Sequence, residues 1–410
     1  SLFSQSAGKL FSLCLSILIG GLTARYLGPA QLGNISFAYS LTAMLAPLGN
    51  LGVRASLLVR LCEGGYPKNI FATAFWIEVL SSLSLTFLLL PLAVLIGGRP
   101  ALPFVTVAII FNVFLQLAEL LEAELFSRNE GMVIASSSVK QSLGGAVATL
   151  LALAFKAPVI VFAGLTGFQS LLRLTFLKKH VPLKAYLRFP PSLLSAKQLI
   201  VKGLPVMGSN LLFVAYLRSD QIMLEWLRGS TDLGIYSVAI KVSECFYFFP
   251  FILAQTFMPH LKIRNNENSQ PVVTTNLESV KLLNKLSWLS GLLISVLIAF
   301  VVPQLIIPIF GDKFLDSANV LIWLAPLGFA MSATYASDSW LQISGFQNHL
   351  FFRGVFGAST NIILNLVLIP KYGVYGAAFS TSISHLASIF IPGLLVKGTR
   401  QNTAQLLFPF

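Results

Sequence analysis

Four basic residues lie within long apolar stretches of this 410-residue chain: Lys140, Arg173, Arg218 and Lys241. A charge inside an apolar segment is costly, and such residues usually face a water-filled cavity or a charged partner. Arg218 and Lys241 lie at similar distances from the turn that joins their stretches, which predicts neighbours able to bind phosphate or acidic groups. The alternative is local neutralisation by Asp220 and Glu244, although Arg218 and Asp220 would point to different faces of one helix.

One additional cation, Arg25, and the two remaining cations of the four extend this prediction. Arg25 ends the first apolar stretch, where it would line the outer part of the same cavity or extend to the membrane surface. Lys140 lies at a similar depth to Glu119 and Glu122 of the preceding stretch. A buried Lys–Glu pair is therefore favoured, and phosphate binding is the alternative. Arg173 lies near the end of its stretch and is expected to extend to the interface.

Candidates for binding a coupling ion or a proton are the acidic and imidazole groups inside the apolar stretches: Asp220, Glu244, Glu78, Asp338 and His385. For Glu78 and Asp338 the favoured interpretation is a hydrogen bond between helices, and for His385 a packed, hydrogen-bonded side chain. The three cysteines have no metal-ligand spacing. The sequence has no phosphate-binding loop of the G-x-x-x-x-G-K-[ST] type, so no metal, cofactor or ATP use is predicted.

Composition sets the class of the protein that must position these residues. Hydrophobic residues make up 55% of the chain and charged residues 10%, and mean hydropathy is +0.79. Soluble domains carry about 25% charged residues, so the composition excludes an ordinary soluble enzyme. Continuous apolar runs predict an all-α polytopic membrane protein rather than a barrel of alternating strands. The net charge of +13 is then explained by basic cytoplasmic loops, and no nucleic-acid partner is predicted.

A membrane-spanning helix needs about 20 apolar residues, and the sequence has twelve such runs. Their approximate limits are 8–25, 33–53, 69–97, 101–126, 132–155, 157–177, 202–227, 233–259, 284–310, 317–345, 350–369 and 372–396. When the connections are assigned alternately to two sides, one side holds 18 Lys and Arg residues, Arg54 and Arg353 among them, and the other holds 6. Because cytoplasmic loops are enriched in Lys and Arg, both termini are predicted to be cytoplasmic.

The basic stretch between the sixth and seventh runs divides the chain into two six-helix halves. The predicted parts are residues 1–177, a linker 178–201, residues 202–396 and a cytoplasmic tail 397–410. The linker mixes basic and apolar residues, so it is either an interfacial segment on anionic lipid or an ordinary cytoplasmic loop. "YLGPAQLGNISFA" after the first run is echoed by "WLRGSTDLGIYSVA" after the seventh. Six runs per half predict a parallel repeat with its pseudo-twofold axis along the membrane normal.

Three segments resemble the polysaccharide-transporter family: "ARYLGPAQLGNISFA", "SDQIMLEWLRGSTDLGIYSVAIKVSE" and "NIILNLVLIPKYGVYGAAFSTSIS". This family includes the Wzx-like O-antigen flippases and belongs to the MATE-related multidrug/oligosaccharidyl-lipid/polysaccharide (MOP) exporter superfamily. The resemblance covers essentially the whole chain in order and in the number of spans. It implies a MATE-like fold of two six-helix lobes.

The resemblance also implies an activity. Family members move undecaprenyl-pyrophosphate-linked oligosaccharides, such as O-antigen repeat units, from the cytoplasmic to the outer leaflet of the bacterial inner membrane by alternating access. Implied partners are this lipid-linked glycan, membrane lipids, H⁺ or Na⁺, and a polysaccharide polymerase with its chain-length regulator. No bond is made or broken, so the protein is expected not to be an enzyme. The alternatives are a MATE-type cation or drug antiporter and a lipid II flippase.

Overall fold

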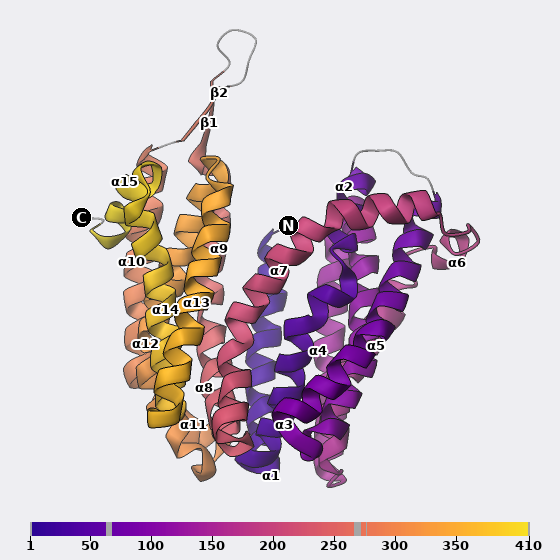
Figure 1. Ribbon diagram of the computed structural model, residues 1–410, viewed down its shortest axis with the longest axis horizontal. Helices are drawn as coiled ribbons and strands as arrows, with labels where there is room; N and C mark the ends of the chain where they lie inside the picture. Colours follow the sequence, from indigo (N-terminus) through magenta and orange to yellow (C-terminus); the bar gives the residue numbers. More distant parts are fainter. Residues whose placement is uncertain (1, 63–67, 266–271, 276, 409–410) are drawn as a thin grey trace. The chain divides into compact units, whose positions relative to one another are not determined.

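The computed structural model describes residues 2–62, 68–265, 272–275 and 277–408. The chain forms two compact units, Ser1–Gly234 and Ile235–Phe410 (Figure 1). The helices of the first unit are α1 (Leu2–Asn50), α2 (Val53–Cys62), α3 (Lys68–Ser127), α4 (Gly131–Ala154), α5 (Val159–Leu177), α6 (Leu183–Tyr186), α7 (Leu193–Arg228) and the beginning of α8 (Ser230–Phe246).

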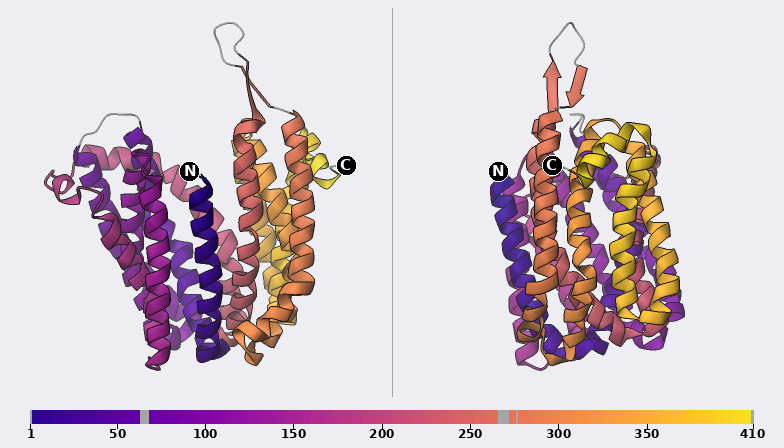
Figure 2. Two further views of the ribbon diagram at one scale, coloured as in Figure 1. Left: turned by 180° about the vertical axis from the view of Figure 1, so that it is seen from behind. Right: turned by 90° about the vertical axis from the view of Figure 1, so that its left-hand side faces the viewer.

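The second unit contains the remainder of α8 and, within the described residues, seven further α-helices with short 3-10 and π segments between them. The elements are α9 (Phe248–Phe257), η1 (Met258–Leu261), α10 (Leu277–Val296), η2 (Leu297–Val301), α11 (Val302–Phe310), η3 (Asp312–Phe314), α12 (Leu315–Ile343), α13 (Gln347–Tyr372), α14 (Val374–Leu395) and α15 (Lys397–Leu407). One antiparallel pair, β1 (Lys262–Asn265) and β2 (Val272–Thr275), projects beyond the helices (Figure 2). These are the only strands within the described residues.

Helix α1 consists of two helices that meet at Gly28. This glycine has φ 73° and ψ 172°, a backbone conformation that side chains with a Cβ rarely adopt. Pro29 follows, and its fixed φ suits the first turn of the second helix. The break falls between the first and second predicted spans, where the sequence analysis placed a connection.

Helix α3 contains the third and fourth predicted spans. A straight helix of its 60 residues would be about 90 Å long. The hydroxyl of Ser82 donates a hydrogen bond to Gln116 Oε1, 34 positions later. The chain must therefore reverse direction between these two residues, as the predicted connection between residues 97 and 101 requires.

Nine helical segments of the described residues are long and apolar enough to cross a membrane. One of them, Ser12–Asn50, contains the break at Gly28 and so corresponds to two predicted spans. The shorter apolar segment Asn69–Leu85 and the 24-residue helix α4 correspond to the third and fifth spans. The twelve predicted runs thus each have a helical counterpart, and the all-α polytopic fold class is confirmed.

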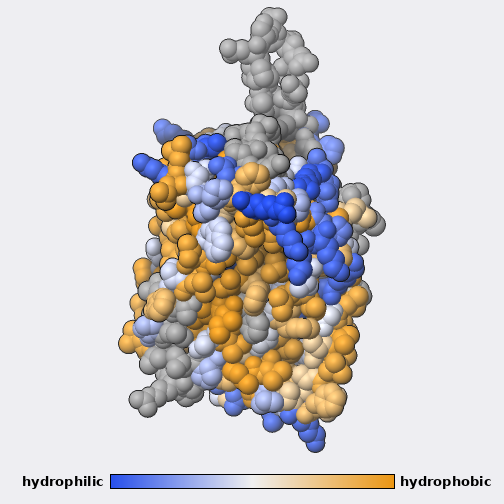
Figure 3. Space-filling view, turned by 90° about the vertical axis from the view of Figure 1, so that its right-hand side faces the viewer, coloured by the Kyte–Doolittle hydropathy of each residue, from blue (hydrophilic) through white to orange (hydrophobic). Residues whose placement is uncertain are grey.

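The exterior is apolar, as lipid requires. Large side chains such as Phe87, Phe155 and Phe300 are 82%, 81% and 69% exposed. On the face drawn in Figure 3, hydrophobic residues form a broad middle zone, while hydrophilic residues gather toward the two ends. This is the inverse of a soluble surface, where a large exposed aromatic patch would be unfavourable.

The predicted linker and tail are both packed against helices. Tyr186 of α6 and Leu199 of α7 belong to a buried cluster with Phe71 and Leu121 of α3. At the other end of the chain, Leu406 of α15 is buried against α10 and α12. The two compact units of the structure therefore meet after Gly234. The boundaries expected from the repeat, with a linker at residues 178–201, stay a prediction.

The two repeat motifs contact each other reciprocally inside the first unit. A spacing of 201 positions relates Gly28 to Gly229, Pro29 to Ser230 and Gly33 to Gly234. Gly229 has φ 88°, a positive value like that of Gly28. A Cβ on Gly33 would lie 1.8 Å from the carbonyl oxygen of Ser230, and a Cβ on Gly234 would lie 1.9 Å from that of Pro29. A twofold relation produces such reciprocal contacts.

Candidate functional site

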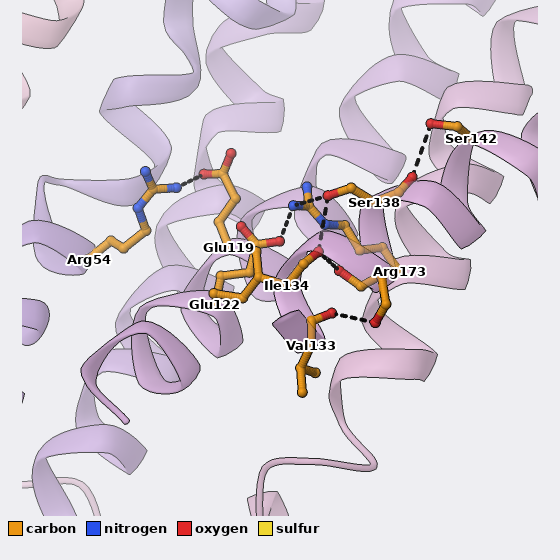
Figure 4. A network of polar contacts seen from close by, with 10 residues as sticks. Arg54, Glu119, Glu122, Val133, Ile134, Ser138, Ser142 and Arg173 are labelled. Carbon is orange, nitrogen blue, oxygen red and sulfur yellow. Dashed lines mark hydrogen bonds and ion pairs between the residues drawn. The ribbon is translucent and has the colours of Figure 1, made fainter. Parts of the chain in front are cut away.

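A charged network in the first unit joins α2, α3, α4 and α5 (Figure 4). Arg54 of α2 forms an ion pair with Glu119, and Arg173 of α5 forms one with Glu122. Arg173 Nη2 also donates to Ser138 Oγ of α4 at 3.3 Å. Arg54 and Glu119 are partly exposed, with side-chain exposures of 46% and 33%, whereas Arg173 and Glu122 are mostly buried.

This network corrects two expectations about its members. The favoured pair of Lys140 with Glu119 or Glu122 is not formed. Lys140 is exposed, and its Nζ lies 3.7 Å from the ring centroid of Phe176 in a cation–π contact. Arg173 does not extend to the interface, because its guanidinium turns inward to Glu122. The partners of both cations depend on the rotation of each helix about its axis, which their positions along the sequence do not give.

Glu78 of α3 lies in the interior beside this network. It is 1% exposed, and its Oε2 has no hydrogen-bond partner among the described residues. The charges that act on it are those of Glu119, which repels a carboxylate, and Arg54, which attracts one. The favoured hydrogen bond from Glu78 to a neighbouring helix is therefore not formed by Oε2.

The other candidates of the first unit lie on α1 and α7. Arg25 is exposed near the end of the first half of α1, close to the break at Gly28. Arg218 of α7 is partly buried, and Asp220 is 2% exposed. The backbone N–H of Gln221 donates to Asp220 Oδ1 at 2.7 Å. The Gln221 side chain accepts from Ser40 Oγ at 2.5 Å, which joins α7 to the second half of α1.

In the second unit, Asp338 of α12 joins α13 through Arg353. Arg353 Nη1 donates to Asp338 Oδ1 and to Ser337 Oγ, both at 3.0 Å. Arg353 is 5% exposed and lies within α13, so counting it as a residue of a connection was wrong. As the seventh residue of α13, it turns its long side chain toward α12. His385 of α14 is also buried.

Lys241 and Glu244 lie on α8, and both are exposed. Arg218 belongs to the first unit and Lys241 to the second. The predicted pairing of these two cations at one depth therefore remains a prediction. Within each unit, the ion pairs between acidic and basic side chains were not predicted from the sequence and are a finding of the structure.

One polar cluster near the linker was missed by the sequence analysis. Glu124 of α3 is fully buried and accepts hydrogen bonds from Arg128 Nη2 at 2.5 Å and from the Tyr186 hydroxyl at 2.7 Å. Burial lowers the pKa of Arg128, but the attraction of Glu124 and hydrogen bonds to Glu124 and Tyr186 outweigh it and hold the pKa above its usual value. The cluster attaches α6, in the predicted linker, to the end of α3.

A second missed feature is a buried amide ladder in the second unit. Asn361 and Asn365 of α13 are both fully buried. Asn365 Nδ2 donates to Asn361 Oδ1 at 2.8 Å, and Asn361 Nδ2 donates to Ser384 Oγ of α14 at 3.1 Å. Two asparagines four residues apart in the apolar run "NIILN" were the available signal, since this spacing places them on one face of a helix.

Chemically, the described residues offer cations, carboxylates and amides at membrane depth. They contain no group of three or more His, Cys, Asp or Glu side chains placed to hold a metal ion. Cations can attract anions, and carboxyl groups can hold protons, so groups of these kinds inside apolar helices are candidates for both roles.

Comparison with known proteins places the chain among glycan-pathway membrane proteins. The family model "Polysaccharide biosynthesis protein" matches residues 1–259. The chain is 24% identical over 371 residues to the "Probable low-salt glycan biosynthesis flippase Agl15" of Haloferax volcanii, covering 88% of this chain and 75% of that protein.

Solved structures share the fold. The lipid II flippase MurJ in an inward closed conformation matches with a TM-score of 0.74 and 15% identity, covering 99% of this chain and 90% of that one. An inward-facing MATE multidrug transporter of the MOP superfamily matches with a TM-score of 0.69 and 16% identity, covering 98% and 95%. The chain therefore belongs to the polysaccharide biosynthesis protein family and has the fold of the MOP-superfamily transporters.

Proposed function

We propose that this protein is a flippase that moves a lipid-linked oligosaccharide across the membrane. The observation that carries the proposal is membership of the polysaccharide biosynthesis family, together with similarity to a probable glycan-biosynthesis flippase along most of the chain. The substrate that we propose is an undecaprenyl-pyrophosphate-linked repeat unit of O-antigen or another surface polysaccharide. It moves from the cytoplasmic leaflet to the outer leaflet of a bacterial inner membrane.

The physical task explains why such a protein needs charges at membrane depth. Sugars and pyrophosphate cannot enter hydrocarbon unaided, because each unsatisfied polar group costs several kcal/mol and an ion costs more. A protein path must therefore supply polar and cationic groups while the lipid tail stays in the bilayer. We assign this role to Arg25, Lys140, Arg218 and Lys241, with the two halves rocking to expose the path alternately.

We further propose a coupling ion, H⁺ or Na⁺, held by one or more of the acidic and imidazole groups within the helices: Asp220, Glu244, Glu78, Asp338 and His385. The protein performs transport without changing a covalent bond, and its termini lie in the cytoplasm. A polysaccharide polymerase and its chain-length regulator would act on the flipped product.

Reconstitution into liposomes tests the proposal. A labelled undecaprenyl-pyrophosphate oligosaccharide is scored in the opposite leaflet, with and without a pH or Na⁺ gradient, beside protein-free liposomes. Movement above the protein-free control is the expected result. The absence of movement in a preparation that exchanges an organic cation for H⁺ or Na⁺ would overturn the proposal in favour of an antiporter. Movement of lipid II alone would change the substrate.

A further inference from the structure

The charged network of the first unit contains more carboxylates than its guanidinium groups can neutralise. Three acids of α3 lie there, and the charge of Glu119 acts on both Glu78 and Glu122. The two guanidinium groups are those of Arg54 and Arg173, and each already forms an ion pair with one acid, Glu119 and Glu122 respectively. Glu78 is the carboxyl that remains.

The other cations near this end of the first unit have partners elsewhere. Lys140 lies over the Phe176 ring, Arg128 is bound to Glu124, and Arg60 Nη2 donates to Gln198 Oε1 at 2.8 Å. None of these contacts reaches Glu78. Among the described residues of this network, Glu78 is therefore the buried acid without an ion-pair partner.

A buried carboxyl that lacks a cation can avoid the cost of an isolated charge by holding a proton. The geometry of Glu78 meets this condition, since it is 1% exposed and its Oε2 lacks a hydrogen-bond partner among the described residues. The repulsion from Glu119 acts in the same direction as burial. A bound proton would also turn the carboxyl into a hydrogen-bond donor.

We propose that Glu78 is a proton-binding site of the first unit and that its occupancy is coupled to the Arg54–Glu119 ion pair. When Arg54 is paired with Glu119, its positive charge mainly compensates the Glu119 carboxylate. Glu78 then holds a proton. When the pair opens, Arg54 can turn to Glu78, whose carboxyl then releases its proton to water and becomes the new ion-pair partner. One proton leaves, one ion pair is exchanged, and no covalent bond between heavy atoms changes.

The proposed proton route to water runs through the partly exposed ion pair of Arg54 and Glu119. Arg54 and Glu119 retain 46% and 33% of their side-chain exposure, whereas Glu78 is closed off. Arg54 lies at the start of the short helix α2, directly after Gly52, which has φ +67°. Val53 and Leu57 hold α2 in the buried cluster with α3, so rotation of the exposed Arg54 side chain alone can open the ion pair.

The inference deepens the proposed function by naming the proton as its coupling ion, and only the transport part of the test rests on that function. The first measurement is infrared difference spectroscopy of the purified full chain in lipid nanodiscs across a pH series. The carbonyl band of a protonated buried carboxyl is expected in the unmodified protein and should be lost in Glu78→Gln. The matched control Glu278→Gln, an exposed acid of α10, should keep it.

Arg54→Ala provides a second variant that does not alter Glu78. Removing Arg54 takes away an attraction and also leaves Glu119 unpaired, and both changes favour the proton on Glu78. The band should therefore persist to a pH about one unit higher or more. Absence of the band in the unmodified protein, or its survival unchanged in Glu78→Gln, would overturn the proton site.

The transport arm separates this inference from the proposed function. In proteoliposomes, an imposed pH gradient should change the rate of glycan flipping by the unmodified protein and by Glu278→Gln, and Glu78→Gln should lose that response. If the imposed pH gradient does not change the flipping rate although the carbonyl band is present, the coupling is overturned. A band that behaves as expected in a protein that flips no glycan would overturn the proposed function and leave the proton site standing.

Discussion

Gly33 and Gly234 each lie directly against a backbone carbonyl of the opposite repeat. An added Cβ would lie 1.8 Å from Ser230 O at the first glycine and 1.9 Å from Pro29 O at the second. Real Cβ atoms do not approach a carbonyl oxygen so closely, so glycine is the residue that lets these backbones meet. The reciprocal contact holds the beginning of α8 against the second half of α1, where the two repeats begin their equivalent helices.

Gly234→Ala should therefore destabilise the protein by forcing these backbones apart. We expect a loss of about 1–3 kcal/mol, the usual range for inserting a methyl group into a close-packed contact. Thermal unfolding in detergent, followed by size-exclusion chromatography, measures the change. Gly208→Ala is the control, since a Cβ at Gly208 would meet nothing within 4 Å. Equal melting temperatures of the two variants would contradict the expected clash.

Tyr186→Phe should loosen the predicted linker from α3. The substitution removes the hydroxyl that donates to the buried carboxylate of Glu124 and accepts from Arg128, at a cost of about 1–2 kcal/mol. Limited trypsin digestion should cut faster after Lys184, inside α6, and after Arg188, two residues beyond its end. Tyr372→Phe, at an exposed ring, is the matched control and should leave the cleavage rate unchanged. Identical digestion of both variants would argue against the anchoring role of Tyr186.

Asp338→Ala should leave the buried Arg353 guanidinium with Ser337 Oγ as its remaining hydrogen-bond partner among the described residues. We expect a loss of about 2 kcal/mol, because an uncompensated buried charge costs more than the pair contributes. The double variant Asp338→Ala with Arg353→Met should recover part of that stability. A double-mutant cycle of thermal unfolding measures the coupling. Strictly additive effects would show that the two side chains do not depend on each other.

Arg218→Ala and Lys241→Ala should each slow glycan flipping in proteoliposomes by about tenfold, equivalent to about 1.4 kcal/mol of lost stabilisation. Arg218→Lys should be milder, since it keeps the positive charge. Lys371→Ala, at an exposed residue near the end of α13, controls for the loss of a cation. Unchanged flipping in both alanine variants at normal expression would remove Arg218 and Lys241 from the substrate path.

The sequence by itself determined the class of the protein, the runs that become helices and the repeat. An apolar chain with 10% charged residues has to place its apolar surface in lipid, and in lipid the backbone must satisfy its own hydrogen bonds within helices. The glycine–proline pair at Gly28 and Pro29 marks a chain reversal locally. These features depend on neighbouring residues, so they can be read along the chain.

Tertiary structure decided which charges meet. Depth along a helix placed Lys140, Glu119 and Glu122 at one level, yet Arg54 and Arg173 became the partners of the two acids. Arg353, counted as a loop cation, turned into the interior to Asp338. Pairing depends on how each helix is rotated about its axis and on which helices pack together. Neither the rotation nor the packing partners can be inferred from the positions of residues along the sequence. The surplus carboxyl of Glu78 became visible only once those pairs were known.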